Sequence, residues 1–176
     1  MNCRHCKKEL INEFIDLGKA PPSNNYVSNQ NKDSSEACYP LKIMVCNSCW
    51  LVQTQDFNDA DELFTDEYAY FSSTSKSFLE HARNYSIEIT DYLKLNRDSF
   101  VVELASNDGY LLQNFLEMKI PCLGIEPTKS TAAISREKGI ETLQEFFSTE
   151  LGLKLSKTKK ADLIIGSLKA TLIQYK

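Results

Sequence analysis

The chain lacks any excess of basic residues. Its 176 residues include 20 Lys and Arg against 24 Asp and Glu, which gives a net charge of −4 and a pI near 5.3. Domains that bind the phosphates of nucleic acids usually have a pI above about 9. The charge therefore argues against a nucleic-acid partner.

Long apolar runs are also missing. The N-terminus, "MNCRHCKKEL", has no apolar core of a signal peptide, and no stretch approaches membrane-spanning length. We therefore expect a cytoplasmic chain with no membrane partner. Its 42% apolar and 25% charged residues are typical of a globular protein. The length suits one ordinary domain, or a small module and part of a larger domain.

Cysteines are plentiful by comparison. Four of the six form two C-x-x-C pairs, Cys3/Cys6 and Cys46/Cys49. Disulfides are uncommon in the cytoplasm, so two such pairs favour a tetrahedral zinc site with four thiolate ligands. The alternative is a redox C-x-x-C, but that motif normally follows a strand of a thioredoxin-like unit, and two copies are unnecessary. The 39 residues between the pairs, 7–45, exceed the usual zinc-ribbon spacing.

We predict a structural zinc in a module of residues 1–60. Four thiolates complete the coordination, which makes His5 and Cys38 bystanders and leaves no position for a reactive water. Residues 14–17 are predicted as a short strand before a turn at Gly18, and "YPLKIMVC" and "CWLVQTQ" as two strands joined across the second cysteine pair. Trp50 and Tyr39 are expected to pack in the core of this module.

A helical connector is predicted for residues 61–98. Phe78, Ala82, Tyr85, Ile89 and Leu93 recur at the spacing of an amphipathic helix. A serine followed three residues later by glutamate, Ser77 and Glu80, suggests a capping box at its start, with a start a few residues earlier as the alternative. The preceding stretch, "YAYFSSTS", is either an aromatic helix entry or a ligand-binding wall of hydroxyl groups. The pattern leaves both open.

From residue 99 the pattern becomes strand–helix alternation. Apolar strands are predicted in "SFVVEL", "PCLGIEP", "IETLQ" and "ADLIIG", with helices in "GYLLQNFLEMK", "KSTAAISREKG" and "STELGLKLSKTK". On the first helix, Leu111, Leu112, Phe115 and Leu116 are expected to face inward. Such alternation predicts an α/β fold with a parallel sheet, here a Rossmann-like domain over residues 99–176. Ligands of such sheets lie beyond the carboxyl ends of the strands.

The loop after the first strand, "ELASNDG", has few of the glycines that nucleotide-binding loops carry. Ala105, Asn107 and Gly109 stand where a G-x-G-x-G loop would place glycines. Alanine is small and asparagine tolerates left-handed backbone angles, so the loop can still turn tightly. It has no Lys-Ser/Thr pair and is not a Walker-type phosphate loop.

Two carboxylates flank this loop. Glu103 ends the first strand and Glu126 ends the second, where a carboxylate can accept hydrogen bonds from ribose hydroxyls. A carboxylate at the first strand suits a cationic cofactor better than a pyrophosphate. The spacing therefore favours S-adenosylmethionine, with NAD(P) as the alternative.

The ordered set of motifs resembles the zinc-ribbon-bearing, S-adenosylmethionine-dependent C-methyltransferases that act on nucleotide-linked keto-deoxysugars. The resemblance runs from Cys3 to Gly166 and is carried by "CRHC", "FIDLGKAPPSNNY", "YPLKIMVCNSCWLVQ", "YAYFSSTSKSFLEHARNY", "VVELASNDGYLLQ", "LGIEP" and "GIETLQEFF". It implies a small zinc domain, a Rossmann-like methyltransferase core and a further C-terminal domain.

Carried over residue by residue, the resemblance implies that Glu126 binds the ribose, that Phe146 and Phe147 lie beside the adenine, and that Tyr68 and Tyr70 face the substrate. The implied cofactor-binding residues are Phe71, Ser72, Glu103, Ala105, Ser106, Asn107, Gly109, Tyr110, Glu126, Pro127, Phe146 and Phe147.

The implied reaction is removal of a proton beside the sugar ketone, followed by attack of the enolate on the sulfonium methyl. It requires a general base and a group that stabilises the enolate oxygen. The resemblance places these groups beyond Gly166, where the last residues, "SLKATLIQYK", depart from the family pattern. We therefore expect a truncated core that lacks its base. The alternatives are a non-catalytic cofactor-binding or interaction module. The sequence indicates neither the sugar nor the oligomeric state.

Overall fold

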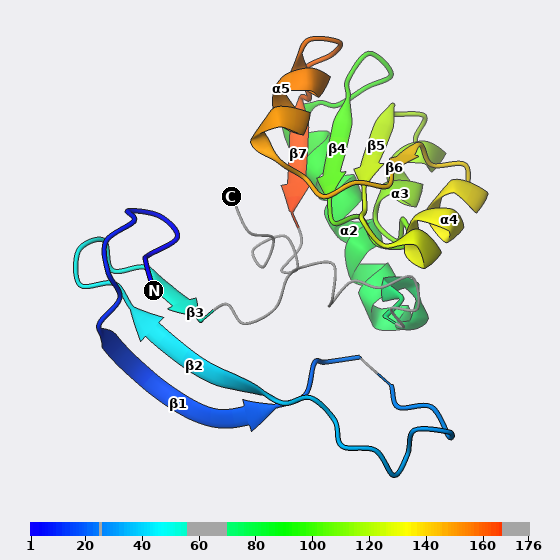
Figure 1. The fold of residues 1–176 in the computed structure, drawn as a ribbon. Helices are drawn as coiled ribbons and strands as arrows, with labels where there is room; N and C mark the ends of the chain where they lie inside the picture. Colours follow the sequence, from blue (N-terminus) through cyan, green and yellow to red (C-terminus); the bar gives the residue numbers. More distant parts are fainter. Residues whose placement is uncertain (25, 56–69, 167–176) are drawn as a thin grey trace. The chain divides into compact units, whose positions relative to one another are not determined.

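The computed structural model describes residues 1–24, 26–55 and 70–166, and the chain forms two compact units, Met1–Leu63 and Phe64–Lys176 (Figure 1). Part of the predicted connector, residues 56–69, and the last ten residues, 167–176, lie outside the described residues. The predicted boundaries at residues 60 and 98 stay predictions.

The N-terminal unit contains an antiparallel sheet of β1 (Asn12–Ala20), β2 (Tyr39–Val45) and β3 (Val52–Thr54), in that order. The predicted strands are confirmed, and the first is longer than expected. The predicted turn at Gly18 is wrong, because β1 continues through it with a register shift between Asp16 and Lys19. Gly18 has a φ of +81° and lies at this shift, where β1 has one residue more than β2. The result is an irregularity of the β-bulge kind within the strand.

The C-terminal unit is an α/β structure with a four-stranded parallel sheet in the order β6-β5-β4-β7. Every strand and helix predicted after residue 99 is present, although most are shorter than their sequence patterns. The elements are η1 (Ser72–Thr74), α2 (Lys76–Leu93), β4 (Val101–Leu104), α3 (Leu112–Glu117), β5 (Cys122–Ile125), α4 (Lys129–Glu137), β6 (Thr142–Leu143), α5 (Thr149–Ser156) and β7 (Leu163–Gly166).

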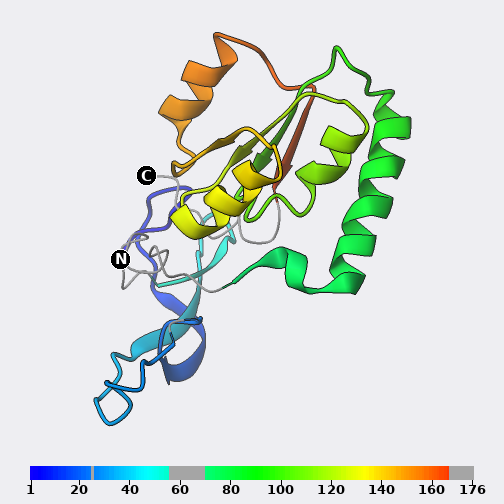
Figure 2. The same ribbon diagram turned by 90° about the vertical axis from the view of Figure 1, so that its right-hand side faces the viewer.

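Helices cover both faces of this sheet, as a parallel sheet requires. In Figure 2, α2 and α3 lie on one side of the strands and α5 on the other. The apolar cores follow the same division. One core joins Ala82 of α2 and Phe115 of α3 to Val101 of β4. The other joins Leu151 of α5 to Val102 of β4. Adjacent residues of one strand therefore point into opposite layers.

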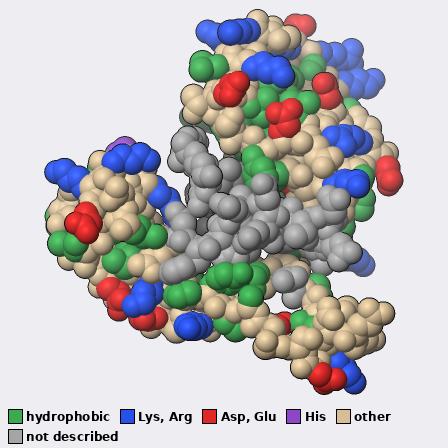
Figure 3. Space-filling model, viewed as in Figure 1, with side chains coloured by type: hydrophobic (Ala, Val, Ile, Leu, Met, Phe, Trp, Pro, Cys, Tyr) green, Lys and Arg blue, Asp and Glu red, His purple; other side chains and the backbone are tan. Residues whose placement is uncertain are grey.

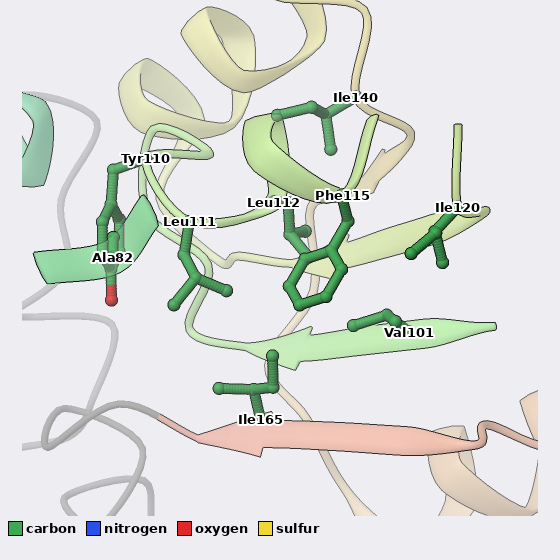
Figure 4. Packing of buried hydrophobic residues seen from close by; sticks show 9 residues of the cluster. All are labelled: Ala82, Val101, Tyr110, Leu111, Leu112, Phe115, Ile120, Ile140 and Ile165. Carbon is green, nitrogen blue, oxygen red and sulfur yellow. The ribbon is translucent and has the colours of Figure 1, made fainter. Parts of the chain in front are cut away.

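The first of these cores is drawn in Figure 4. The ring of Phe115 lies over Val101, and Leu111 and Leu112 reach toward the strands from the start of α3. These three side chains of the predicted inner face are buried, but Leu116 is 40% exposed. The prediction for Leu116 is wrong, because the six-residue helix α3 turns that position out of the buried stripe.

The predicted amphipathic helix is α2, but its cap differs from the prediction. Ser75 is the N-cap residue and accepts a hydrogen bond from the amide of Phe78 at 3.3 Å, so the proposed cap at Ser77 is two residues too late. The middle of the apolar stripe is in the core, whereas Leu93 is 41% exposed at the C-terminal end of the helix. In the described parts of the chain, no helix combines the length and apolarity needed to cross a bilayer.

Candidate functional site

The two cysteine pairs form matching backbone turns. The amide of Lys7 donates to the carbonyl of Cys3 at 3.0 Å, and the amide of Trp50 donates to the carbonyl of Cys46 at 2.9 Å. Lys7 and Trp50, each directly after the second cysteine of its pair, both have a φ of +63°. This left-handed conformation accompanies a Trp50 side chain that is 73% exposed. The prediction that Trp50 packs in the module core is therefore wrong. Tyr39 is half-buried.

These turns bring the four predicted sulfurs together. All four lie within 4.8 Å of one another, with Cys3 and Cys49 at 3.6 Å and Cys6 and Cys46 at 3.5 Å. A tetrahedral zinc with Zn–S bonds of about 2.3 Å separates its sulfurs by about 3.8 Å. The residues present therefore form a four-cysteine site that fits zinc. As predicted, Cys38 is exposed and outside the cluster.

Hydrogen-bond donors around the sulfurs favour thiolates. The pKa of Cys3 is lowered to about 6, first by the amide of Cys6 and also by Gln53, whose side-chain amide donates to the Cys3 sulfur at 3.3 Å. Although the amide of Leu51 lowers it, the pKa of Cys49 is raised to about 12 by burial and by the neighbouring thiols. A divalent cation would favour the thiolate form of all four cysteines, including Cys49, because it attracts negatively charged sulfur.

The second candidate site is the loop between β4 and α3. Ala105, Asn107 and Gly109 have φ angles of +55°, +52° and +73°. The three positions at which a glycine-rich loop would place glycines thus take left-handed conformations, although only one of them is glycine. The loop is closely packed, since a Cβ on Gly109 would lie 2.8 Å from the Ser135 hydroxyl of α4.

Glu126, at the end of β5, faces this loop. One of its oxygens, Oε2, accepts from the amide of Asn107 at 2.8 Å, and Oε1 accepts from the amide of Thr128 at 3.0 Å. The residue is only 4% exposed. A carboxylate oxygen can accept two hydrogen bonds, so each oxygen retains capacity for a ligand hydroxyl.

Glu103, at the end of β4, is completely buried, and neither carboxylate oxygen has a hydrogen-bond partner within the described residues. Burial raises the pKa of Glu103 well above its usual range, and the negative charges of Glu126 and Asp108 raise it further. The Tyr110 hydroxyl lowers that pKa, but it does not reach hydrogen-bond geometry with the carboxylate. Burial therefore disfavours the ionised form of Glu103 at this site.

The residues before α2 lie against the loop. Asn107 uses its side chain to bind the backbone of Tyr70 and Ser72, and Asp108 binds Ser73. The structure thus brings residues 70–75, the described part of "YAYFSSTS", to the predicted cofactor loop. Phe71 belongs to this segment and is half-buried. Tyr68 is outside the described residues. A contribution of this segment to ligand binding stays a prediction.

The other predicted ligand residues differ in their surroundings. The ring of Tyr110 stacks on Phe78 with centroids 4.9 Å apart. Phe147 packs against the core beneath α5, whereas Pro127 and Phe146 are half-buried. Their ligand contacts stay predictions.

Several buried polar atoms around this sheet edge have no hydrogen-bond partner among the described residues: both carboxylate oxygens of Glu103, Ser106 Oγ, Asp108 Oδ1 and Thr128 Oγ1. Such atoms are costly to bury unless a ligand or water satisfies them. The set is rich in acceptors and negative charge, which fits a polar cationic ligand. Sequence reasoning missed Asp108 and Thr128, whose only signal was their position beside Asn107 and Glu126.

Charged side chains of both signs are interspersed on the face of each unit visible in Figure 3. No area of a single sign stands out among the described residues on that face. The predicted absence of a nucleic-acid partner stays a prediction.

The fold and the two sites define a protein with a four-cysteine zinc-binding module and a Rossmann-like α/β unit. Residues 3–64 match the family described as "Putative zinc binding domain". The chain is also 27% identical over 154 residues to the C-methyltransferase NovU of Streptomyces niveus. That alignment covers 88% of this chain and 36% of NovU, so the chain spans about a third of the length of this relative. The predicted resemblance is thus confirmed as distant homology to a C-methyltransferase.

Proposed function

We propose that this protein is an S-adenosylmethionine-dependent C-methyltransferase and that the described α/β unit binds its cofactor. The observation that carries the proposal is the loop of residues 105–109. Its three left-handed positions lie directly after β4, with the buried carboxylates Glu103 and Glu126 at the ends of adjacent strands. The similarity to NovU supports the same assignment.

The residues around the loop fit the parts of this cofactor. Glu126 retains the capacity to accept hydrogen bonds from ribose hydroxyls, while its present bonds hold the loop. Buried Glu103 would become ionised beside a cation, since an opposite charge favours the charged form. S-Adenosylmethionine, when bound, supplies a methyl group on a sulfonium. The zinc module has a closed thiolate set, so its proposed role is structural.

The proposed substrate is a nucleotide-linked keto-deoxysugar, and the proposed location is the cytoplasm. Methylation at carbon requires removal of a proton from the carbon beside the ketone, by a base within hydrogen-bond reach. The base is proposed to lie beyond Gly166, outside the residues that the structure describes.

The cofactor assignment is tested by calorimetric titration of the 176-residue chain with S-adenosylhomocysteine and, separately, with NAD. We expect S-adenosylhomocysteine to bind more tightly. Glu126→Gln should weaken it by about tenfold or more, because a hydrogen bond to a charged group contributes about 1.5–3 kcal/mol. The matched control is Glu137→Gln, at an exposed position of α4. Preferred binding of NAD, or equal affinities of the Glu126→Gln and Glu137→Gln variants, would contradict the proposal.

A further inference from the structure

Asn107 occupies a loop position that glycine would fill without backbone strain. Its φ of +52° is left-handed, a conformation that asparagine tolerates better than most residues but less freely than glycine. The chain therefore has an asparagine where the backbone alone would favour glycine. The reason lies in its side chain.

The Asn107 side chain connects the loop to the segment that enters α2. Its Oδ1 accepts a hydrogen bond from the amide of Ser72 at 2.7 Å, and its Nδ2 donates to the carbonyl of Tyr70 at 3.0 Å. Asn107 is 2% exposed and Ser72 is 5% exposed, so water does not easily replace the bond between them, whereas the bond to Tyr70 is partly buried. One buried amide thus satisfies two backbone groups of residues 70–73.

The neighbouring Asp108 makes a second connection to the same segment. Its Oδ2 accepts from the amide of Ser73 at 3.2 Å and also from the Ser73 hydroxyl. The ammonium of Lys138, at the end of α4, donates to the Asp108 carbonyl at 2.6 Å and lies 3.8 Å from Oδ2. The loop is therefore fixed between α4 and the entry to α2.

Asn107 also contacts Glu126, the carboxylate that is proposed to bind the ligand. Its backbone amide donates to Glu126 Oε2 at 2.8 Å. A single residue therefore touches Glu126 through its backbone and residues 70–72 through its side chain. Direct contacts therefore connect Glu126 to this segment.

We infer that Asn107 and Asp108 are positioning residues that hold residues 70–73 against the cofactor loop, so that ligand binding and ordering of this segment stabilise each other. The inference rests on the proposed function for the identity of the ligand. The coupling is reciprocal, since a ligand that orders the segment must bind less tightly when the segment is released.

The informative variant is Asn107→Gly. It removes both side-chain bonds, relieves the left-handed backbone and restores the glycine of a common nucleotide-binding loop. If backbone freedom were the main requirement, this variant would bind S-adenosylhomocysteine as tightly as the native chain or more tightly. We expect binding about tenfold weaker, because one buried and one partly buried hydrogen bond that order the segment are lost. Lys119→Gly is the matched control, since Lys119 also has a positive φ, +59°, but follows α3.

Amide hydrogen exchange at Ser72 and Ser73 separates positioning from general stability. In the native chain, S-adenosylhomocysteine should slow exchange at both amides. In Asn107→Gly, exchange without ligand should be faster by about tenfold, and the ligand should no longer slow it. Lys119→Gly should behave as the native chain in both respects.

The outcomes are distinct. If the native chain fails to bind S-adenosylhomocysteine, the proposed function fails, while exchange without ligand still tests whether Asn107 holds the segment. Unchanged exchange in Asn107→Gly, or faster exchange with unchanged ligand affinity, would overturn the inference. Should Asn107→Gly not fold, Asn107→Asp serves instead: it keeps the acceptor for Ser72 but sets a carboxylate oxygen against the Tyr70 carbonyl, so a shift in the same direction is expected.

Discussion

Replacing Glu103 by glutamine should make the ligand-free protein more stable at high pH. Glu103 is completely buried at the end of β4, and its carboxylate oxygens lack hydrogen-bond partners in the described residues. Burial first, and then the charges of Glu126 and Asp108, raise its pKa well above the ordinary value, against a smaller lowering by Tyr110. Glu103→Gln keeps the shape of the protonated side chain and cannot ionise.

The sign of the pH dependence follows from proton linkage. In the unfolded chain Glu103 titrates near 4.3, and in the folded chain at a higher pH. Between these values the folded state holds a proton that the unfolded state has released. The stability contributed by the protonated form is therefore complete below about pH 4.3 and is lost as the pH rises through the folded-state pKa. Each pH unit between the two pKa values corresponds to about 1.4 kcal/mol.

Other titrating groups surround Glu103 and must be the same in both proteins. Tyr85 of α2 and Cys122 of β5 both have a raised pKa, first because of burial and then because of the charge of Glu103. The pKa of Cys122 is about 11, so this thiol stays neutral over the range to be tested. Glu126 and Asp108 are retained in the variant.

The assay is urea unfolding, followed by helical circular dichroism, from pH 5 to pH 8 at constant zinc and without cofactor. The free energy of unfolding of Glu103→Gln minus that of the native chain should increase with pH, by up to about 1.4 kcal/mol for each pH unit. Glu137→Gln, which changes an exposed carboxylate, should show no such trend. A difference that does not depend on pH would refute the reasoning, because it would mean that Glu103 ionises normally in the folded state.

Two further predictions concern other parts of the chain. One zinc per chain should be found by metal analysis, and Cys46→Ser should unfold the N-terminal unit, since structural zinc supplies on the order of 10–16 kcal/mol; exposed Cys38→Ser should change neither result. Gly124→Ala should lower the free energy of unfolding by about 1–3 kcal/mol, because the new Cβ would lie 2.5 Å from Ser106 Oγ. Adding Ser106→Gly should restore part of this loss, and full additivity of the two changes would contradict the proposed clash.

The secondary structure of the α/β unit could be predicted because its signals are local. Short apolar strands and amphipathic helices alternate from residue 99 onward, and each predicted element is present. The cysteine cluster could be predicted for a similar reason, since the C-x-x-C spacing fixes two sulfurs on one backbone turn. The loop conformation could also be predicted from the sequence, because the positions of Ala105, Asn107 and Gly109 match a known pattern of left-handed residues.

Features that depend on distant contacts, or on positive φ angles outside a known loop pattern, were not predictable. Trp50 was expected in a core because it is large and apolar, but its left-handed backbone accompanies a side chain that is 73% exposed. Gly18 suggested a turn, whereas a glycine with positive φ also suits a bulge. The bond between Asn107 and Ser72 joins residues 35 positions apart, and no local pattern announces such a contact.

The loop also provides a comparison between two changes toward the same glycine-rich pattern. Ala105→Gly relieves a left-handed alanine, worth about 1–2 kcal/mol. It also increases the conformational entropy of the unfolded chain, which lowers the stability by about 0.4–1 kcal/mol. Loss of a buried methyl group costs about 0.8 kcal/mol more. These terms nearly cancel, so Ala105→Gly should be close to neutral.

Asn107→Gly gains less from backbone relief, because asparagine tolerates this conformation. It loses one buried and one partly buried hydrogen bond, at about 0.5–1.5 kcal/mol each, and leaves the buried amide of Ser72 without its acceptor. Urea unfolding should therefore place Asn107→Gly about 2 kcal/mol below Ala105→Gly in stability. Equal stabilities would mean that the asparagine side chain contributes nothing to the folded loop. A stability of Asn107→Gly above that of the native chain would show that backbone strain outweighs both of its hydrogen bonds.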